Sequence, residues 1–577
     1  MLEVASAWER VGELESFAPG SLTTWKMHRT QLVIGRTEAG AVFALDNRCP
    51  HEGYPLAQGN LNDCTLTCNW HNWKFDVRDG TCLLGGEGAR SYPVRIVDGV
   101  VEVNLAEPPP EATWPRLRAG LDDAFHQGDT GQALREAARL LHSGYAPLRL
   151  LADVGRYDAL HAEYGSSHVL AVAADSAGLL GRQRGVAALA IVAPVLELCI
   201  DTDARLPVRS LPTPLPGATG AEFRAAVEAE DNERAEGLLR GAFAAGIPRA
   251  EIESWLCRAV ADHFLDFGHA LIYLVKAVTF LDRVDADYAC DIEAGLVYSI
   301  VLGTREDRLP YLRSSFARVA TFAPEFPAVF AAARPGTDWD ASALRDAVLD
   351  GSSAAAVDGV WEALRRGVTP EEVAQALVAA AAHRLLRFDT RWESDPEVAE
   401  NWLWATHRLT FASAVRHAVL RFREPAALHF LFQAAAFIQT GRPMDMPAAA
   451  RPPLEAAATA SIPTLVDSIR SRRSEEAVAC AARLLQDESN VDLVYRALED
   501  HCSDCFVRPI FVAHALKTTL AAIEEHQSLT GHPDRAVPLL AAVRFLASPV
   551  RERDLHAQVH RSLRWVVAGR VPRKLTQ

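Results

Sequence analysis

Residues 49–75, CPHEGYPLAQGNLNDCTLTCNWHNWKF, decide the fold of the first part of the chain, because they contain two Cys/His pairs. Cys49 and His51 form the first pair, Cys68 and His71 form the second, and sixteen residues separate His51 from Cys68. Pro50 in the first pair and Asn69-Trp70 in the second are poor strand residues, so both pairs are expected on tight loops. Two thiolates and two neutral imidazoles can together hold a 2Fe–2S cluster, with the cysteines on one iron and the histidines on the other.

The two loops resemble those of the Rieske family. Cys-Pro-His-Glu-Gly-Tyr-Pro-Leu at 49–56, Cys-Asn-Trp-His-Asn-Trp-Lys-Phe-Asp at 68–76 and the closing Gly80 carry this resemblance, which extends over about the first 105 residues. A structural zinc site is the alternative, but zinc loops usually repeat one spacing, such as two CxxC knuckles. Respiratory members of the family add a second cysteine after each ligand pair. None stands there in this chain, so the resemblance is to the ferredoxin and oxygenase branch.

Length, charge and cysteine content restrict the class of protein. The chain has 577 residues, enough for three or four domains, and 49% of them are hydrophobic. A formal charge of −15 argues against nucleic acid or an anionic membrane as a partner, because both attract basic surfaces. Residues 1–15 lack the pattern of a signal peptide. The ten cysteines, two of them assigned to the cluster, are typical of reduced thiols in a cytoplasmic protein rather than of a disulfide framework. We therefore expect a cytoplasmic protein that binds neither nucleic acid nor a membrane.

The first 107 residues are expected to form the small all-β Rieske domain. Short alternating runs occur throughout it, and Asp98-Gly99 marks a hairpin turn between two such runs. Pro108-Pro109-Pro110 and Pro115 then interrupt the pattern, so residues 108–120 are expected to be a stiff proline-rich linker.

Residues 121–577 are expected to form a large all-α domain of four internal repeats. Apolar residues recur there at spacings of three and four, which is typical of helices. Four stretches align without gaps, and their units start near 121, 223, 344 and 465. One column of the alignment is always alanine, and three stretches end in glycine, as helix C-termini often do. These residues are Ala133, Ala235, Ala356 and Ala477, followed by Gly144, Gly246 and Gly367.

Each unit also contains two regularly placed histidines. The first set comes 40, 40, 39 and 36 positions after the unit start and consists of His161, His263, His383 and His501. The second set stands at the start of Ala- and Leu-rich helices and consists of His168, His269, His407 and His514. Acidic residues follow the first set, among them Asp266 and Asp504.

Two interpretations of these histidines compete. A repeated ancestor would keep a histidine for capping and packing within each unit, without any further function. Alternatively, helices of different units bring His and carboxylate side chains to one non-haem iron site, as helical bundles do. The fused Rieske domain favours the second interpretation, because a one-electron donor needs an acceptor. On this basis all eight histidines, with Asp266 and Asp504, are candidate metal ligands, and His269, His407 and His514 are candidate catalytic residues.

The helices that begin with the second histidines also resemble the questin-oxidase-like family of ring-cleaving monooxygenases, for example at Phe267-Gly268-His269-Ala270-Leu271-Ile272. This resemblance covers only short segments. It would allow an enzyme without a second metal.

The sequence thus predicts a Rieske-dependent oxidoreductase, most simply an oxygenase. The 2Fe–2S cluster would pass electrons to the non-haem iron site, where a small organic substrate is oxidised. An external reductase or ferredoxin is expected as the electron source, since no GxGxxG unit in a strand–helix context is present to bind a nicotinamide or flavin. The alternative is an electron-carrier or redox-sensing protein whose helical repeats bind a partner and hold no second metal.

Overall fold

A computed structural model describes residues 8–203, 206–393, 401–448, 451, 456–503, 509–548 and 555–570. These residues divide into two compact units. The first unit contains the described residues within 1–150, 183–189 and 557–577, and the second contains those within 151–182 and 190–556. The first unit therefore extends beyond residue 107, the predicted end of the β domain, and includes the first helices of the chain.

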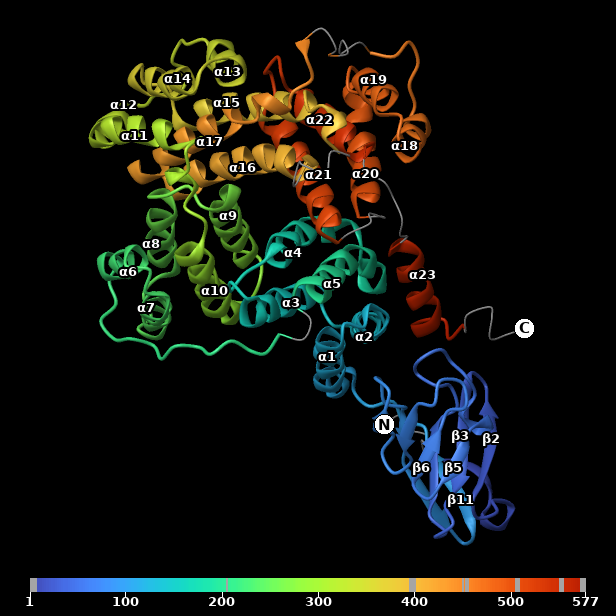
Figure 1. The fold of residues 1–577 in the computed structure, drawn as a ribbon. Helices are drawn as coiled ribbons and strands as arrows, with labels where there is room; N and C mark the ends of the chain where they lie inside the picture. Colours follow the sequence, from blue (N-terminus) through green and yellow to red (C-terminus); the bar gives the residue numbers. More distant parts are fainter. Residues whose placement is uncertain are drawn as a thin grey trace, which may run out of the picture. The chain divides into compact units, whose positions relative to one another are not determined.

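The first unit begins with a small all-β domain, as predicted (Figure 1). Its strands form three sheets with the orders β1-β11-β10, β2-β3-β4-β9 and β5-β6-β7-β8. The strands are β1 (Trp8–Glu13), β2 (Ser21–Met27), β3 (Thr30–Arg36), β4 (Val42–Asp46), β5 (Asn60–Asn62), β6 (Thr65–Thr67), β7 (Lys74–Asp76), β8 (Cys82–Leu84), β9 (Ser91–Tyr92), β10 (Val94–Val97) and β11 (Val100–Asn104).

Strand β3 is buried on both faces and joins two apolar clusters. Leu32 and Ile34 belong to one cluster, whereas Val33 belongs to the other, as expected when successive side chains point to opposite faces. The cluster around Val33 also contains Cys49 and Cys68. The two cysteines are therefore fixed by the core of the β domain.

The hairpin predicted at Asp98-Gly99 is present. Val97 pairs with Val100 across the turn, and φ is positive at both central residues, 49° at Asp98 and 81° at Gly99. Positive φ at both positions is the requirement of the type I′ turns that match the twist of antiparallel strands.

The described chain after β11 is helical. Its α-helices are α1 (Pro110–Gln127), α2 (Thr130–His142), α3 (Pro147–His161), α4 (His168–Leu179), α5 (Leu189–Asp203), α6 (Gly220–Glu228), α7 (Asn232–Ala244), α8 (Arg249–Ala261), α9 (His269–Leu281), α10 (Ala289–Leu302), α11 (Arg313–Phe322), α12 (Phe326–Ala332), α13 (Ala341–Asp350), α14 (Ser353–Arg365), α15 (Pro370–Leu386), α16 (Asn401–Phe422), α17 (Leu428–Gln439), α18 (Ile462–Arg470), α19 (Ser474–Leu484), α20 (Val491–Cys502), α21 (Pro509–Ser528), α22 (Val537–Leu546) and α23 (Leu555–Val566).

Most of the predicted linker is part of a helix. Of residues 108–120, those from Pro110 onward lie in α1. A proline is tolerated at the first helical position because the N–H that it lacks would have no partner there. Pro115 lies inside the same helix. The proline run thus marks the start of a helix.

Each of the four aligned stretches falls on two consecutive helices that contact each other: α1 and α2, α6 and α7, α13 and α14, and α18 and α19. The alanine column is fully buried in every pair, at Ala133, Ala235, Ala356 and Ala477. The three glycines that end the stretches have positive φ, 88° at Gly144, 72° at Gly246 and 90° at Gly367. The division into four repeated units stays a prediction.

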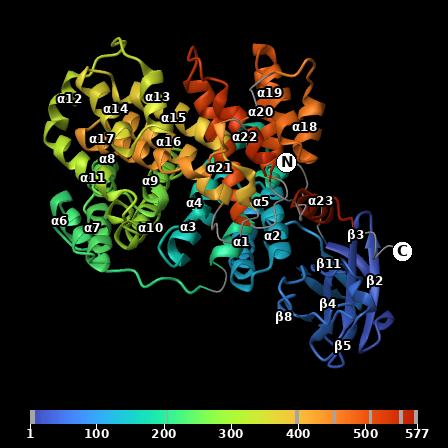
Figure 2. The same ribbon diagram turned by 45° about the horizontal axis from the view of Figure 1, so that its top comes forward.

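In the second unit, four helices surround one point of the interior. Helix α9 contacts α4 and α16, and α21 contacts the same two helices (Figures 1 and 2). Each of the four carries one histidine of the second set. This closed arrangement brings together residues that are more than 300 positions apart in the sequence.

One stretch of the described chain, Gly185–Thr202, is long and apolar enough to cross a membrane by length and composition. Of this stretch, 56% is buried inside the protein, which is also the behaviour of a core helix.

Candidate metal centres

The two Cys/His loops of the β domain have the same backbone hydrogen bonds. The N–H of Cys49 donates to the carbonyl of Tyr54, and the N–H of Cys68 donates to that of Trp73, both at 2.8 Å. The cysteine carbonyls in turn accept from Gly53 and from Asn72, at 2.8 and 3.0 Å.

A residue with positive φ closes each loop, with 80° at Gly53 and 61° at Asn72. The left-handed region suits glycine and is tolerated by asparagine. Two equivalent loops are thus built from different sequences.

The four predicted cluster ligands converge. The thiols of Cys49 and Cys68 hydrogen-bond to each other, which raises the pKa of Cys49 and lowers the pKa of Cys68 to about 6. Nδ1 of His51 lies 3.0 Å from Nδ1 of His71. Backbone N–H groups of the loops also donate to the sulfurs, which is an arrangement that tunes the potential of an iron–sulfur cluster. Two thiols and two imidazole nitrogens directed toward each other fit a 2Fe–2S cluster.

The two histidines of this centre have different surroundings. His51 is half-buried and stacks on Trp73, with ring centroids 4.6 Å apart and planes at 12°. His71 is exposed and meets Trp70 edge-on at 5.6 Å. Burial lowers the pKa of His51, and the neighbouring His71 and Arg135 lower it further.

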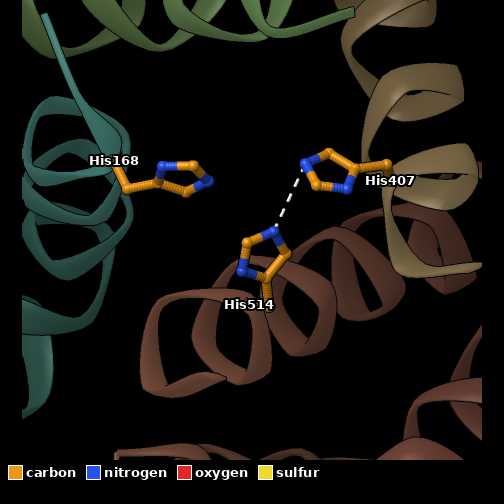
Figure 3. A group of neighbouring side chains, drawn as sticks. All are labelled: His168, His407 and His514. Carbon is orange, nitrogen blue, oxygen red and sulfur yellow. Dashed lines mark hydrogen bonds between the residues drawn. The ribbon is translucent and has the colours of Figure 1, made fainter. Parts of the chain in front are cut away.

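The four histidines of the second set form a cluster, here called the tetrad, in which His407 and His514 are buried and His168 and His269 are half-buried. Nε2 of His407 lies 2.8 Å from Nε2 of His269 and 3.3 Å from Nε2 of His514. Nε2 of His269 lies 3.3 Å from Nε2 of His168. The nitrogens of His168, His407 and His514 all lie within 4.8 Å of one another (Figure 3). His168, His407 and His514 thus form a group that could hold one metal ion, and His269 adjoins this group through His168 and His407.

The opposite edges of these rings are hydrogen-bonded. Nδ1 of His407 donates to the carbonyl of Leu403 at 2.6 Å, and Nδ1 of His514 donates to that of Ile510 at 2.7 Å. His269 donates to the backbone carbonyl of Asp266. A neutral imidazole whose proton is used at Nδ1 has only a lone pair at Nε2. Lone pairs about 3 Å apart repel one another, so the donor set fits a cation placed between them.

His168 differs from the other three, since its Nδ1 contacts a side chain. The hydroxyl of Tyr273 lies 3.1 Å from this nitrogen. Tyr273 follows His269 by four positions on α9, so the two side chains share a face of the helix. The tyrosine is buried and links the tetrad residues of α4 and α9.

A strained turn precedes His269 and places its ring beside the other histidines of the tetrad. Three successive residues before it have positive φ: 45° at Asp266, 54° at Phe267 and 88° at Gly268. A Cβ atom on Gly268 would lie 2.2 Å from the ring of Phe411. Left-handed non-glycine residues cost free energy and often occur at functional sites.

Burial keeps the tetrad neutral. It lowers the pKa of all four histidines, that of His269 to about 3, and Lys517 adds to the effect. Lys517 lies on α21, three residues after His514, and its amine has no hydrogen-bond partner among the described residues. Burial lowers the pKa of this amine to about 7. Neutral imidazoles are the form that binds metal ions.

The first set of histidines lies outside the tetrad. Nδ1 of His161 contacts the carbonyl of Leu206, Nε2 of His263 contacts Glu228, and Nε2 of His383 contacts Asp534. His501 is buried in α20 and is likewise not in the group. Three histidines of the first set thus bind a carbonyl or carboxylate group away from the tetrad, and none of the four lies in the tetrad.

Of the two predicted acidic ligands, Asp266 is not found in the tetrad either. The carboxylate of Asp266 accepts from the N–H of Thr304, and only its backbone carbonyl contacts a tetrad histidine. Asp504 lies outside the described residues. The ligand group that the described part of the chain forms consists of histidines.

Sequence reasoning missed Tyr273 and Lys517. Their positions contained a usable signal, because each follows a tetrad histidine by three or four residues and therefore shares its helix face. Lys276, by contrast, is used elsewhere, since it forms a buried ion pair with Asp175.

Comparison with known proteins agrees with the first centre. A model of the Rieske [2Fe-2S] domain matches residues 7–93. The anthranilate 1,2-dioxygenase ferredoxin subunit of Burkholderia cepacia is 30% identical over 100 residues, which are 17% of this chain and 92% of that protein. The chain belongs to the Rieske [2Fe-2S] family through its N-terminal domain.

Two larger relatives are oxygenases by name. The 4beta-methylsterol monooxygenase of Methylococcus capsulatus is 31% identical over 105 residues, 15% of this chain and 28% of the relative. The 3-chlorobenzoate-3,4-dioxygenase oxygenase subunit of Comamonas testosteroni is 33% identical over 116 residues, 18% of this chain and 26% of the relative. The chain thus spans about a quarter of the length of these relatives. The Rieske domain and these relatives support an oxidoreductase.

Proposed function

We propose that the chain is a Rieske-dependent oxygenase with two metal centres. Cys49, His51, Cys68 and His71 hold a 2Fe–2S cluster, and the tetrad holds a non-haem iron that receives electrons from it. The substrate is a small organic molecule. An external reductase or ferredoxin supplies the electrons, in keeping with the ferredoxin subunit among the relatives.

The observation that carries this proposal is that the Nε2 atoms of four histidines lie close together, while hydrogen bonds on the other side of the rings hold them in place. Histidines kept for packing would each bind a group of their own unit. The tetrad histidines instead face one another across four helices, at 2.8 to 3.3 Å. Hydrogen bonds at the far nitrogen are typical of metal-binding histidines, since they fix the tautomer and the ring orientation.

The proposed ligand set differs from the predicted His/carboxylate set, because it contains four histidines. Imidazole ligands suit iron, copper, nickel and zinc. Zinc has no redox chemistry and would give a one-electron donor no acceptor. Iron is a redox-active metal that imidazole suits, and it is the metal we propose for the tetrad.

When bound, the iron would supply the one-electron chemistry that activates dioxygen toward the substrate. The protein contributes the surroundings of the metal. Four helices enclose the tetrad, backbone carbonyls hold the Nδ1 protons of His407 and His514, and a third carbonyl accepts from His269. The hydroxyl of Tyr273 contacts the fourth ring.

Replacing Tyr273 with Phe is expected to weaken iron binding by about 10- to 100-fold, the usual effect of losing a hydrogen bond to a metal-binding histidine. The reason is the loss of the hydroxyl contact at Nδ1 of His168, which leaves that ring free to turn. Competition with a chelator of known affinity measures the change, with the Rieske absorption as an internal reference.

Tyr288→Phe is the matched control, because it removes a buried hydroxyl that donates to Asp153 at 2.8 Å. It is expected to leave iron affinity unchanged. Equal iron affinity in the Tyr273 and Tyr288 variants would contradict the role assigned to Tyr273.

Iron analysis of the purified chain tests the proposal as a whole, because the alternative electron carrier needs only the two irons of the cluster.

A further inference from the structure

Helix α2 contacts the β domain through a buried ionic group in the first unit. The carboxylate of Glu87, in the loop between β8 and β9, has a side chain only 1% exposed. Arg135 donates to both of its oxygens, with Nε at 3.0 and 2.9 Å and Nη2 at 2.6 Å. Arg139 donates to the same carboxylate from Nη1 at 2.5 Å. Both arginines belong to α2.

This loop connects the ionic group with His51. Trp73 stacks on the ring of His51, and a Cβ atom on Gly85 would lie 2.4 Å from the indole of Trp73. The next residue, Gly86, approaches Gln132 of α2 equally closely. Contacts without gaps thus run from His51 through Trp73 and the loop to α2.

The ionic group is formed by two arginines and two glutamates. Arg135 and Arg139 bring two positive charges, and Glu87 brings one negative charge. Glu136 contacts Arg139 at 3.1 Å and adds a second carboxyl group. Since the group is largely removed from water, its field is only weakly screened by salt.

We propose that Arg135, held by Glu87, is a positioning residue that raises the reduction potential of the 2Fe–2S cluster. Reduction adds one negative charge to the cluster, and a nearby positive charge stabilises the reduced form. Helix α2 would in this way set the driving force with which electrons leave the cluster. The inference rests on the proposed function, because it requires the cluster at Cys49, His51, Cys68 and His71.

Arg135 lies close to this centre, because Trp73, which stacks on His51, packs against the loop that carries Glu87. The geometry also explains why Arg135, and not Arg139, is the residue to test. Arg135 donates hydrogen bonds to both carboxylate oxygens of Glu87, whereas Arg139 donates to one of them and also contacts Glu136.

The test is a redox titration of the full-length holoprotein, followed by the absorption and electron resonance of the cluster. Arg135→Gln is expected to lower the midpoint potential, and Glu87→Gln is expected to raise it. Arg135→Lys keeps the charge and should remain near the wild-type potential. Arg95→Gln, which removes a charge from an exposed pair with Glu102, should have no effect.

Opposite signs for the Arg135→Gln and Glu87→Gln variants are the decisive result, because mere loosening of the loop would shift both potentials in the same direction. Equal shifts in Arg135→Gln and Arg135→Lys, or unchanged potentials with the cluster retained, would overturn the inference. If Arg135→Gln does not fold, the midpoint potential of Glu87→Gln still tests the inference. A potential that does not rise in Glu87→Gln would overturn it. A wild-type protein that holds no Rieske cluster would instead refute the proposed function.

Discussion

Replacing His71 with Ala is expected to abolish the Rieske absorption and electron resonance signals of the protein. The cluster would lose one of two imidazoles on the same iron, and no other described histidine lies beside His51 to replace it. His71 is exposed, so its loss creates no cavity in the core. The helical circular dichroism should therefore survive.

His28→Ala provides the control, because it changes a histidine of the same domain in the turn between β2 and β3. That variant should keep the cluster. A His71→Ala protein that still shows the full Rieske spectrum would remove this residue from the ligand set.

Replacing His407 with Ala is expected to remove the iron of the tetrad and substrate turnover, while the Rieske signal remains. His407 is the central member of the group, since its Nε2 lies within 3.3 Å of both His269 and His514. Its loss also leaves a space in the buried ring, so some stability should be lost. Metal analysis of the folded variant, together with its thermal unfolding, separates the two effects.

His383→Ala is the matched control for this variant. His383 belongs to the first set and contacts Asp534 at 3.0 Å, away from the tetrad. The His383→Ala variant should lose stability without losing iron. If His407→Ala behaves in the same way, the tetrad histidines serve packing and the metal proposal fails.

The β domain was predictable because its signals are short-range. The two loops are specified by neighbouring residues, and the Asp98-Gly99 turn is specified by two positions that tolerate positive φ. The helical character of the rest was equally predictable from the spacing of apolar residues. The proline run at 108–110 was less informative, because proline both ends sheets and starts helices.

The tetrad was predictable in part. The second histidines were singled out because one follows in every unit at the start of an Ala- and Leu-rich helix, and the structure brings all four together. The same reasoning also selected the first set, because sequence spacing does not show which way a helix face is turned. His263 and His383 find acidic partners 35 and 151 positions away, and such long-range contacts leave no local pattern.

Iron content of the full-length protein, measured with the Rieske signal quantified in the same sample, tests the central claim most directly. The proposal predicts one iron per chain beyond the two in the cluster. In His407→Ala this additional iron should be absent and the Rieske signal unchanged. A fully loaded wild-type protein with only the two cluster irons would contradict the account and favour an electron carrier without a second metal.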